Sequence, residues 1–386
     1  MSKIYVDNAS TTKMSARARE VLVENLDIYA NPSSIYSEGA KAQKLLEGAR
    51  ESVAKSLGAG FSREIYFTSG ATESCNWAAQ IAKNIGNRDG KKHILTSAIE
   101  HHAVLHSLEK LRDDGFEIEI VPVASRGIVD VAAFKSALRE DTIMTSIMLV
   151  NNEIGTIQPI EEIAKICKEH GVLLHSDATA AAGKIQIDIV DLGVDMLSIS
   201  AHKFYGPKGV GAFYCKKTVL MDSFFHGGAQ ERGKRGGTEN LPAVMAMATA
   251  LEESILKIEA TSKHLSGLVD KLRGDISKIP KVVFNGEPNL QVPGFLNCCF
   301  RAVEGESLLL LLDMAGIMAS SGSACTSGSL DPSHVLLAIG LPHEIAHGSL
   351  RISLSSENTE EEIDEICENI PKIVARLREM SPLWNE

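Results

Sequence analysis

The stretch Val194-Asp195-Met196-Leu197-Ser198-Ile199-Ser200-Ala201-His202-Lys203, followed by Phe204-Tyr205-Gly206-Pro207-Lys208-Gly209, decides the fold class. Its first part, from Val194 to Ile199, is mostly apolar; it then ends in a hydroxyl, an imidazole and a lysine, and Gly206 and Pro207 break it. This pattern predicts a short buried strand that carries polar side chains at its end. A lysine placed there can be desolvated, which lowers its pKa and lets it form a Schiff base.

A second strand end lies 26 residues earlier, where Val172-Leu173-Leu174-His175 leads into Ser176-Asp177-Ala178. A strand-end Asp and a strand-end Lys are the pair that a pyridoxal phosphate site needs. The lysine carries the aldehyde as an imine, and the carboxylate keeps the pyridine nitrogen protonated, so that the ring acts as an electron sink. The alternative that these two motifs leave open is a buried Asp–Lys ion pair.

The whole chain has 386 residues, enough for two domains, with 44% hydrophobic and 23% charged residues. A net charge of −11 argues against nucleic-acid binding through bulk electrostatics. No apolar run approaches the roughly 20 residues that span a bilayer, and no signal-peptide pattern opens the chain. Seven cysteines without framework spacing fit free thiols in a reducing compartment. We therefore expect a cytoplasmic protein that binds neither membranes nor nucleic acids directly.

Between about residues 60 and 215, strand-like and helix-like stretches alternate, which predicts an α/β fold with a mostly parallel sheet covered on both faces. The expected strands are Glu64–Thr68, His93–Ser97, Ile118–Val123, Ile143–Val150, Val172–His175, Val194–Ser200 and Val210–Cys215, and Ile160–His170 is an expected helix. Ligands bind such sheets at the carboxyl ends of the strands. Residues 15–255 are predicted to form the large domain.

The remaining chain, residues 1–14 and 256–386, is predicted to form a smaller α+β domain. A mostly helical connection from Glu239 to about Ile276 leads into it. Shorter strands and helices then follow, at Val282–Phe284, Phe295–Phe300, Glu306–Met314 and Leu350–Leu354. The last helix opens with Thr359 and Glu362, which have the spacing of a capping box.

Three further segments could take part in a site, each with a plainer alternative. The turn Phe67–Glu73 joins a strand to a helix start and could cradle a phosphate, or be a simple N-cap. His101 could stack on a ring and move protons, or be an ordinary exposed or core histidine. The glycine-rich, basic segment His226–Thr238 could be a functional loop or a flexible surface loop.

Cys325 lies in a second notable segment, Ala319–Ser329, among small polar residues rather than in a core pattern. We expect an accessible, nucleophilic thiol on a mobile loop, about 319–329. Arg351 lies among apolar neighbours in Leu350–Leu354. A half-buried arginine needs an anion, which could be a substrate carboxylate or a structural carboxylate.

Together these segments resemble the cysteine desulfurases of group I (NifS/IscS-like), within the class-V aminotransferase family. The resemblance spans nearly the whole chain and rests on ordered motifs. These are Tyr5–Thr12, Asn31–Ser34, Thr68–Ser74, Glu100-His101, Val150–Gly155, Ser176–Thr179, Ala201–Lys203, Ser321–Ser327 and Arg351.

The resemblance implies a fold-type I, pyridoxal 5'-phosphate-dependent homodimer that converts L-cysteine to L-alanine and a persulfide on Cys325. It makes Lys203 the Schiff-base lysine and His101 the ring-stacking acid/base. The remaining assignments concern binding. Asp177 would pair with the ring nitrogen, and Asn152 would contact the ring hydroxyl and the substrate carboxylate. Arg351 would clamp that carboxylate. The phosphate would be bound by Ala71, Thr72, Ser200 and His202, and Thr238 would reach the phosphate of the neighbouring subunit's cofactor.

The resemblance also implies a protein that accepts the sulfur, either an iron–sulfur scaffold or a thiolation enzyme, and no resident metal is expected. Cys325 could transiently ligate an iron–sulfur cluster. Family members usually carry Gln where this chain has Ala180, so one contact to the ring hydroxyl is missing. Three alternatives stay open: a selenocysteine lyase, an aminotransferase on the same fold, and a weakly active sulfur-transfer scaffold.

Overall fold

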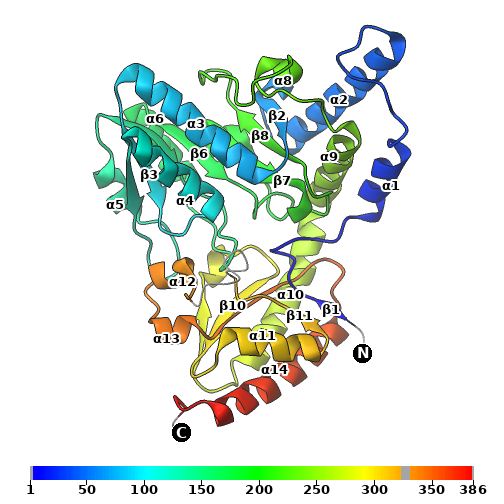
Figure 1. Cartoon of the computed structure of the whole chain (residues 1–386). Coiled ribbons are helices and arrows are strands. Elements are labelled where there is room, and N and C mark those ends of the chain that lie inside the picture. The colour runs from blue at the N-terminus through cyan, green and yellow to red at the C-terminus, as the bar shows by residue number, and fades with distance from the viewer. Residues whose placement is uncertain (1–2, 323–330, 385–386) are drawn as a thin grey trace.

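The computed structural model describes residues 3–322 and 331–384 and is built around one large mixed sheet with a smaller layered part below it (Figure 1). The large sheet has the strand order β2-β8-β7-β6-β5-β3-β4. Its strands are β2 (Ile65–Thr68), β3 (His93–Ser97), β4 (Glu117–Val121), β5 (Thr142–Ser146), β6 (Leu173–Asp177), β7 (Met196–Ser200) and β8 (Gly211–Cys215). All neighbouring pairs are parallel except the two that β8 makes, with β2 and β7. The predicted mostly parallel, mixed sheet is confirmed.

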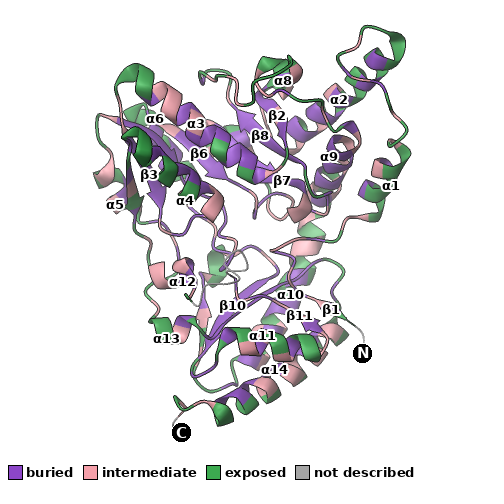
Figure 2. Ribbon diagram, in the orientation of Figure 1, coloured by how far each residue is buried: buried purple, intermediate pink, exposed green. Residues whose placement is uncertain are grey.

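Both faces of this sheet are covered, so β3, β5, β7 and β8 are buried along their length, whereas the edge strand β4 has exposed residues (Figure 2). Successive side chains alternate between the faces. Met196 and Phe213 pack with α3 and α4 on one face, whereas Leu197 and Tyr214 belong to the larger core that α2, α6 and α9 close on the other. The helices of this part are α1 (Ala16–Glu24), α2 (Ser37–Ser56), α3 (Ala71–Asp89), α4 (His102–Glu109), α5 (Val131–Ala137), α6 (Ile160–His170), α7 (Ile189–Leu192), α8 (Gln230–Gly233) and α9 (Leu241–Leu256).

The smaller part has its own core, formed by an antiparallel sheet of order β12-β10-β9 and three long helices. The start of the chain joins it, because β1 pairs in parallel with β11. Its elements are β1 (Ile4–Tyr5), α10 (Ile258–Ile276), β9 (Val282–Asn285), β10 (Phe295–Phe300), α11 (Gly305–Met314), β11 (Ile317–Met318), α12 (His334–Ala338), α13 (His343–Ala346), β12 (Ser349–Ser353) and α14 (Glu360–Met380). The domain boundary at residues 14/15 and 255/256 stays a prediction.

Most expected elements lie close to their predicted bounds, and the differences have local causes. The strand predicted over Ile143–Val150 ends at Ser146, because the amide of Met148 donates to the buried carboxylate of Glu100 at 2.9 Å instead of continuing the ladder to β3. The connection after Glu239 divides into two helices at Lys257. The capping box at Thr359 and Glu362 is present. None of the described helices is long and apolar enough to cross a membrane.

Candidate functional site

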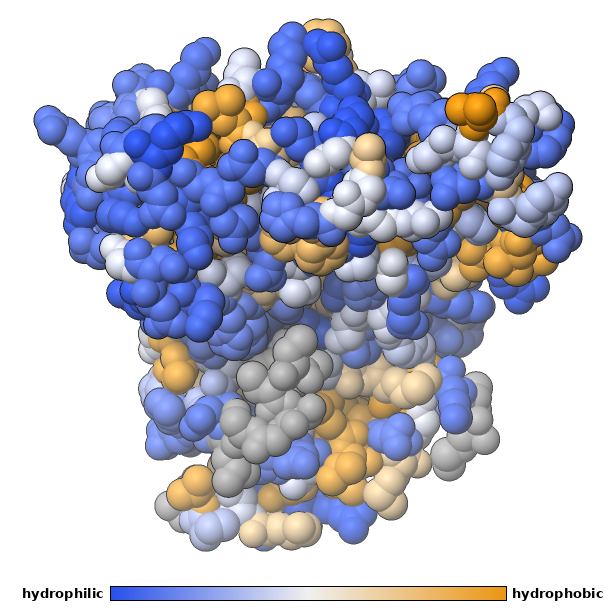
Figure 3. Space-filling model, turned by 45° about the horizontal axis from the view of Figure 1, so that its top comes forward, coloured by the Kyte–Doolittle hydropathy of each residue, from blue (hydrophilic) through white to orange (hydrophobic). Residues whose placement is uncertain are grey.

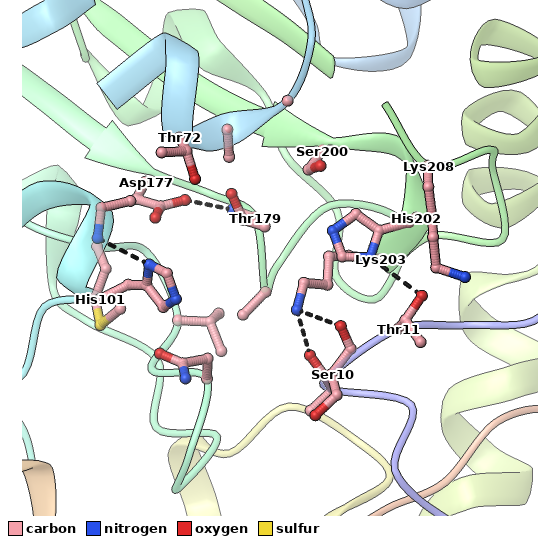
Figure 4. A pocket seen from close by; sticks show the side chains of 18 of the residues that line it. Ser10, Thr11, Thr72, His101, Asp177, Thr179, Ser200, His202, Lys203 and Lys208 are labelled. Carbon is pink, nitrogen blue, oxygen red and sulfur yellow. Dashed lines mark hydrogen bonds between the residues drawn. The ribbon is translucent and has the colours of Figure 1, made fainter. Parts of the chain in front are cut away.

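A cavity of about 550 Å³ opens where the carboxyl ends of the parallel strands face the smaller part. It brings together most of the residues that the sequence singled out. Those that line it are Ala71, Thr72, His101, Asn152, Asp177, Ser200, His202, Lys203 and Arg351. Thr238 is exposed and does not line it, and Cys325 lies outside the described residues, although Gly322 lines the cavity. Figure 4 shows His101 and Asp177 on one side and His202 and Lys203 on the other.

One end of the cavity is the start of α3, where β2 turns through Ser69 and Gly70. Gly70 has a φ of +152° and caps the 19-residue helix without a side-chain hydrogen bond, so the positive end of α3 faces the cavity. The backbone can approach this closely because position 211 is also glycine: a Cβ on Gly211 would lie 2.7 Å from the Gly70 Cα. Thr72 and Ser200 add hydroxyls at the same end (Figure 4). This arrangement suits an anionic group such as a phosphate.

An ion pair between Glu73 and Arg235 stabilises that turn. Glu73 accepts hydrogen bonds from the Ser69 amide at 2.7 Å and from Arg235 at 2.9 and 3.1 Å. Burial raises the pKa of Glu73, but the hydrogen bonds from Arg235 and Ser69 outweigh burial and leave that pKa below its ordinary value. The negative charge of Glu73 at the start of α3 is therefore neutralised by Arg235. Arg235 belongs to the glycine-rich segment that also carries Thr238.

Asp177, the last residue of β6, also lines the cavity. The Asp177 side chain is almost fully buried, and its Oδ1 accepts a hydrogen bond from the Thr179 amide at 2.9 Å. Its Oδ2 lies 4.0 Å from the Cys75 Sγ. Burial, followed by the charge of Asp177, raises the pKa of Cys75 well above its usual value, so this residue stays a thiol. A buried carboxylate that lines the cavity suits a cationic group such as a protonated ring nitrogen.

His101 caps the N-terminus of α4 and lies beside Asp177. Its Nδ1 accepts a hydrogen bond from the Ala103 amide at 3.0 Å, so the neutral ring carries its proton on Nε2. Burial lowers the pKa of His101, and Lys203 and His334 act in the same direction, while Asp177 opposes them. A neutral, oriented imidazole of this kind can accept a proton from a ligand in the cavity.

Lys203 follows β7 by one short turn, Ala201–Lys203, and its Nζ donates to the carbonyl oxygens of Ala9 at 2.6 Å and Ser10 at 2.8 Å. The N-terminal segment is held against this turn, because the Thr12 amide donates to the His202 carbonyl at 2.8 Å. Burial and the nearby Lys203 lower the pKa of His202 to about 4, so its ring is neutral.

Arg351, on β12, joins three segments at the floor of the cavity. Its Nη2 contacts Asp7 Oδ1 and Ser10 Oγ, both at 2.7 Å, and its Nη1 donates to the Asn152 carbonyl at 3.0 Å. The sequence left open whether a structural carboxylate or a ligand satisfies this arginine, and Asp7 is such a carboxylate. Its Nε has no hydrogen-bond partner among the described residues, but this atom is buried and is not open to the cavity.

Sequence reasoning assigned no role in the site to Asp7, Ser10 or Lys184, although all three lie in or against the cavity. For the first two, the quoted motif Tyr5–Thr12 was the available signal, but nothing in it shows that it contacts Arg351. Lys184 had no signal at all, because one lysine after a run of alanines is typical of an exposed helix end. Ala180, where Gln is usual in the resembled family, lines the cavity.

Comparisons with known proteins agree with this geometry. The family model described as "Aminotransferase class-V" matches residues 4–366. Cysteine desulfurase IscS of Methanosarcina thermophila is 49% identical over 382 residues, which cover 98% of this chain and 94% of that protein. The chain belongs to the cysteine desulfurases of the class-V aminotransferase family. The resemblance drawn from the motifs is thereby confirmed.

Two solved structures support the same assignment. A structure titled "NIFS-LIKE PROTEIN" has a TM-score of 0.91 at 38% identity and covers 97% of this cysteine desulfurase and 100% of its own chain. A second, titled "SspA in complex with cysteine", has a TM-score of 0.78 at 32% identity, covering 92% and 100%. The predicted fold class, that of the fold-type I pyridoxal phosphate enzymes, is confirmed by these neighbours.

Proposed function

We propose that this protein uses pyridoxal 5'-phosphate to remove sulfur from L-cysteine, giving L-alanine and a persulfide on Cys325. The observation that carries the proposal is the convergence of Lys203, Asp177 and the start of α3 on one cavity. In the reaction the carbon–sulfur bond of cysteine breaks, a sulfur–sulfur bond to Cys325 forms, and the proton of the Cys325 thiol balances the alanine product. The similarity to a structure titled as a complex with cysteine supports this substrate.

The residues present fit the cofactor at both of its ends. The start of α3, which no side chain caps, would hold the phosphate together with Ala71, Thr72, Ser200 and His202, and Asp177 would hold the ring nitrogen. When bound, the cofactor supplies an electron-withdrawing ring that stabilises negative charge on the substrate carbons. Asn152 would contact the ring hydroxyl and the substrate carboxylate, and Ala180 offers no side-chain donor there.

The side chains of this chain would then bind the substrate and move its protons. Lys203 Nζ would take the proton from the substrate α-carbon, and the neutral ring of His101 would accept or return a proton beside the ring. Arg351, together with Asn152, would hold the substrate carboxylate. Cys325 would attack the substrate sulfur as a thiolate, since the thiolate is the nucleophilic form.

A homodimer is part of the proposal. Thr238 is exposed and outside the cavity of its own chain, as expected if it reaches the phosphate of a neighbouring subunit. Ile35 and Tyr36, at the start of α2, are 103% and 53% exposed and Tyr29 before them is 89% exposed, so this segment offers large apolar side chains that a partner could cover. Elsewhere the surface in Figure 3 is largely hydrophilic, with separate apolar areas. A second copy of the chain would cover such a segment and complete the site.

The persulfide would pass to a protein acceptor, an iron–sulfur scaffold or a thiolation enzyme. Cys325 remains the residue that could transiently ligate a cluster. We also propose a cytoplasmic location without direct nucleic-acid or membrane binding. The net charge of −11 and six described cysteines that are all free support it.

The test compares wild type, Lys203→Ala and Cys325→Ser in an assay of alanine and sulfide from L-cysteine. Lys203→Ala should lose all turnover, and borohydride should reduce the cofactor onto Lys203 in the wild type. Cys325→Ser should still shift the visible spectrum when cysteine is added, but form no persulfide and only trace alanine. Near-normal desulfuration by Cys325→Ser would refute the role of this thiol. Amino transfer to a keto acid without sulfide would favour the aminotransferase alternative.

A further inference from the structure

Lys184 reaches the cavity next to Lys203 although the two belong to different segments. The turn after β6 brings it there, because Gly183 packs closely against the segment that carries Lys203. With a φ of +73°, Gly183 lies where an added Cβ would be 2.8 Å from the side chains of Phe204 and Ser254. The Lys184 Nζ donates to the carbonyl oxygen of Lys203 at 3.2 Å and to that of Ala180 at 3.3 Å.

No carboxylate balances this ammonium among the described residues. Its described hydrogen bonds are to these two carbonyl oxygens, and the centroid of the Phe295 ring lies 6.0 Å from Nζ. A partly buried ammonium without an ion pair is costly, and the chain would avoid the cost with an apolar residue here. Burial, followed by the charges of Lys203 and Arg351, lowers the pKa of Lys184 to about 7.

The charged and titratable groups around the two lysines come from several elements, and most are cationic or neutral. They are Arg351 on β12, which Asp7 neutralises, Lys208 after the Lys203 turn, His202 in that turn, His101 at the N-cap of α4, Asp177 on β6, and Glu73 on α3, which Arg235 neutralises. Asp177 is therefore the cavity carboxylate without an ion-pair partner in the described part of the chain. Lys184 thus places a further cation beside the Lys203 segment.

We propose that Lys184 is a positioning residue whose ammonium holds the backbone of Lys203 and repels positive charge on the Lys203 nitrogen. This proposal rests on the proposed function. A neighbouring cation is a general way to make a lysine nitrogen give up its proton near neutral pH. In the cofactor-loaded enzyme, over the pH range in which Lys184 is itself protonated, the Lys203 nitrogen would therefore release its proton to solvent at a lower pH than it would without Lys184.

The experiment titrates the visible absorption band of the cofactor-loaded enzyme with pH. Lys184→Gln keeps a donor for the two carbonyls but removes the charge, Lys184→Met removes both, and Lys184→Arg keeps both. Lys165→Met, at an exposed lysine of α6 outside the cavity lining, controls for net charge. The midpoint should rise by roughly 0.5 to 1.5 pH units in the Gln and Met variants and stay near the wild-type value in the Arg and Lys165 variants.

Unchanged midpoints in both Lys184→Gln and Lys184→Met would overturn the proposal, as would a shift confined to Lys184→Met, which would reflect lost hydrogen bonds instead of lost charge. If Lys184→Arg does not fold, the comparison of Lys184→Gln with Lys165→Met decides. A wild-type enzyme in which borohydride fixes the cofactor to a lysine other than 203 would overturn the proposed function, and this inference with it. The two failures are thereby distinguishable.

Discussion

Replacing His175 by Gln should weaken the acid sensitivity of the fold. His175 lies on β6, and its ring nitrogens contact Ser146 Oγ at 2.8 Å and Ser198 Oγ at 2.9 Å. Burial lowers the pKa of His175 to about 4, with Asp177 opposing the shift only in part. The imidazole is therefore held neutral in the folded protein, two residues before the carboxylate proposed to hold the cofactor.

The sign follows from proton binding. An unfolded histidine titrates near pH 6.5, so between about pH 6.5 and 4 the unfolded chain binds more protons at this position than the folded chain. The free energy of unfolding consequently falls as the pH drops through that window and is unaffected above it. For a folded pKa of about 4, lowering the pH from 7 to 5 costs about 2 kcal/mol.

Urea denaturation of wild type and His175→Gln at pH 7 and pH 5 measures this difference. The variant should be less stable at pH 7, because it loses hydrogen bonds to Ser146 and Ser198, but its loss of stability between the two pH values should be smaller by about 2 kcal/mol. His170→Gln, at an exposed histidine ending α6, is the matched control and should behave as the wild type. An equal loss in wild type and His175→Gln would refute the reasoning.

Two further changes probe the site. Arg351→Lys should lower kcat/KM for cysteine by about 10- to 100-fold, mainly through KM. Hydrogen bonds to charged groups are worth about 1.5–3 kcal/mol, and lysine lacks the two parallel donors of the guanidinium group. An unchanged KM in steady-state kinetics would contradict this expectation. Arg235→Ala should weaken cofactor binding about tenfold in a fluorescence titration, because Glu73 would face the phosphate unpaired. Arg88→Ala, at the far end of α3, is its control, and equal affinities would count against the role of Arg235.

Local patterns were enough to predict the large sheet and one side of the site. The apolar runs before Asp177 and Lys203 are strands, their ends meet at one edge, and His93–Ser97 and Ile160–His170 have the predicted bounds. This worked because the parallel strands are buried on both faces and read as continuous apolar runs. The same reasoning identified Thr359 and Glu362, since a capping box is a purely local device.

What the sequence did not show depends on contacts between distant segments. Arg351 meets Asp7 across 344 positions, and Lys203 donates to Ala9 across 194. Lys184 enters the cavity only because Gly183 packs on the segment after Lys203. Neither residue of such a contact stands in a periodic sequence pattern. Composition and spacing therefore could not decide whether Arg351 pairs with a structural carboxylate or with a ligand.

The charge distribution gives these separate contacts one physical meaning. The chain has a net charge of −11, yet its cavity is lined by Lys184, Lys203, Lys208 and Arg351. Of the nearby carboxylates, Glu73 and Asp7 are each neutralised by an arginine, which leaves Asp177 buried at one end. Such a field favours a ligand with one cationic group facing Asp177 and anionic groups elsewhere. A cofactor with a protonated ring nitrogen and a phosphate, carrying an amino acid with its carboxylate, has that distribution, which neither motif nor net charge reveals alone.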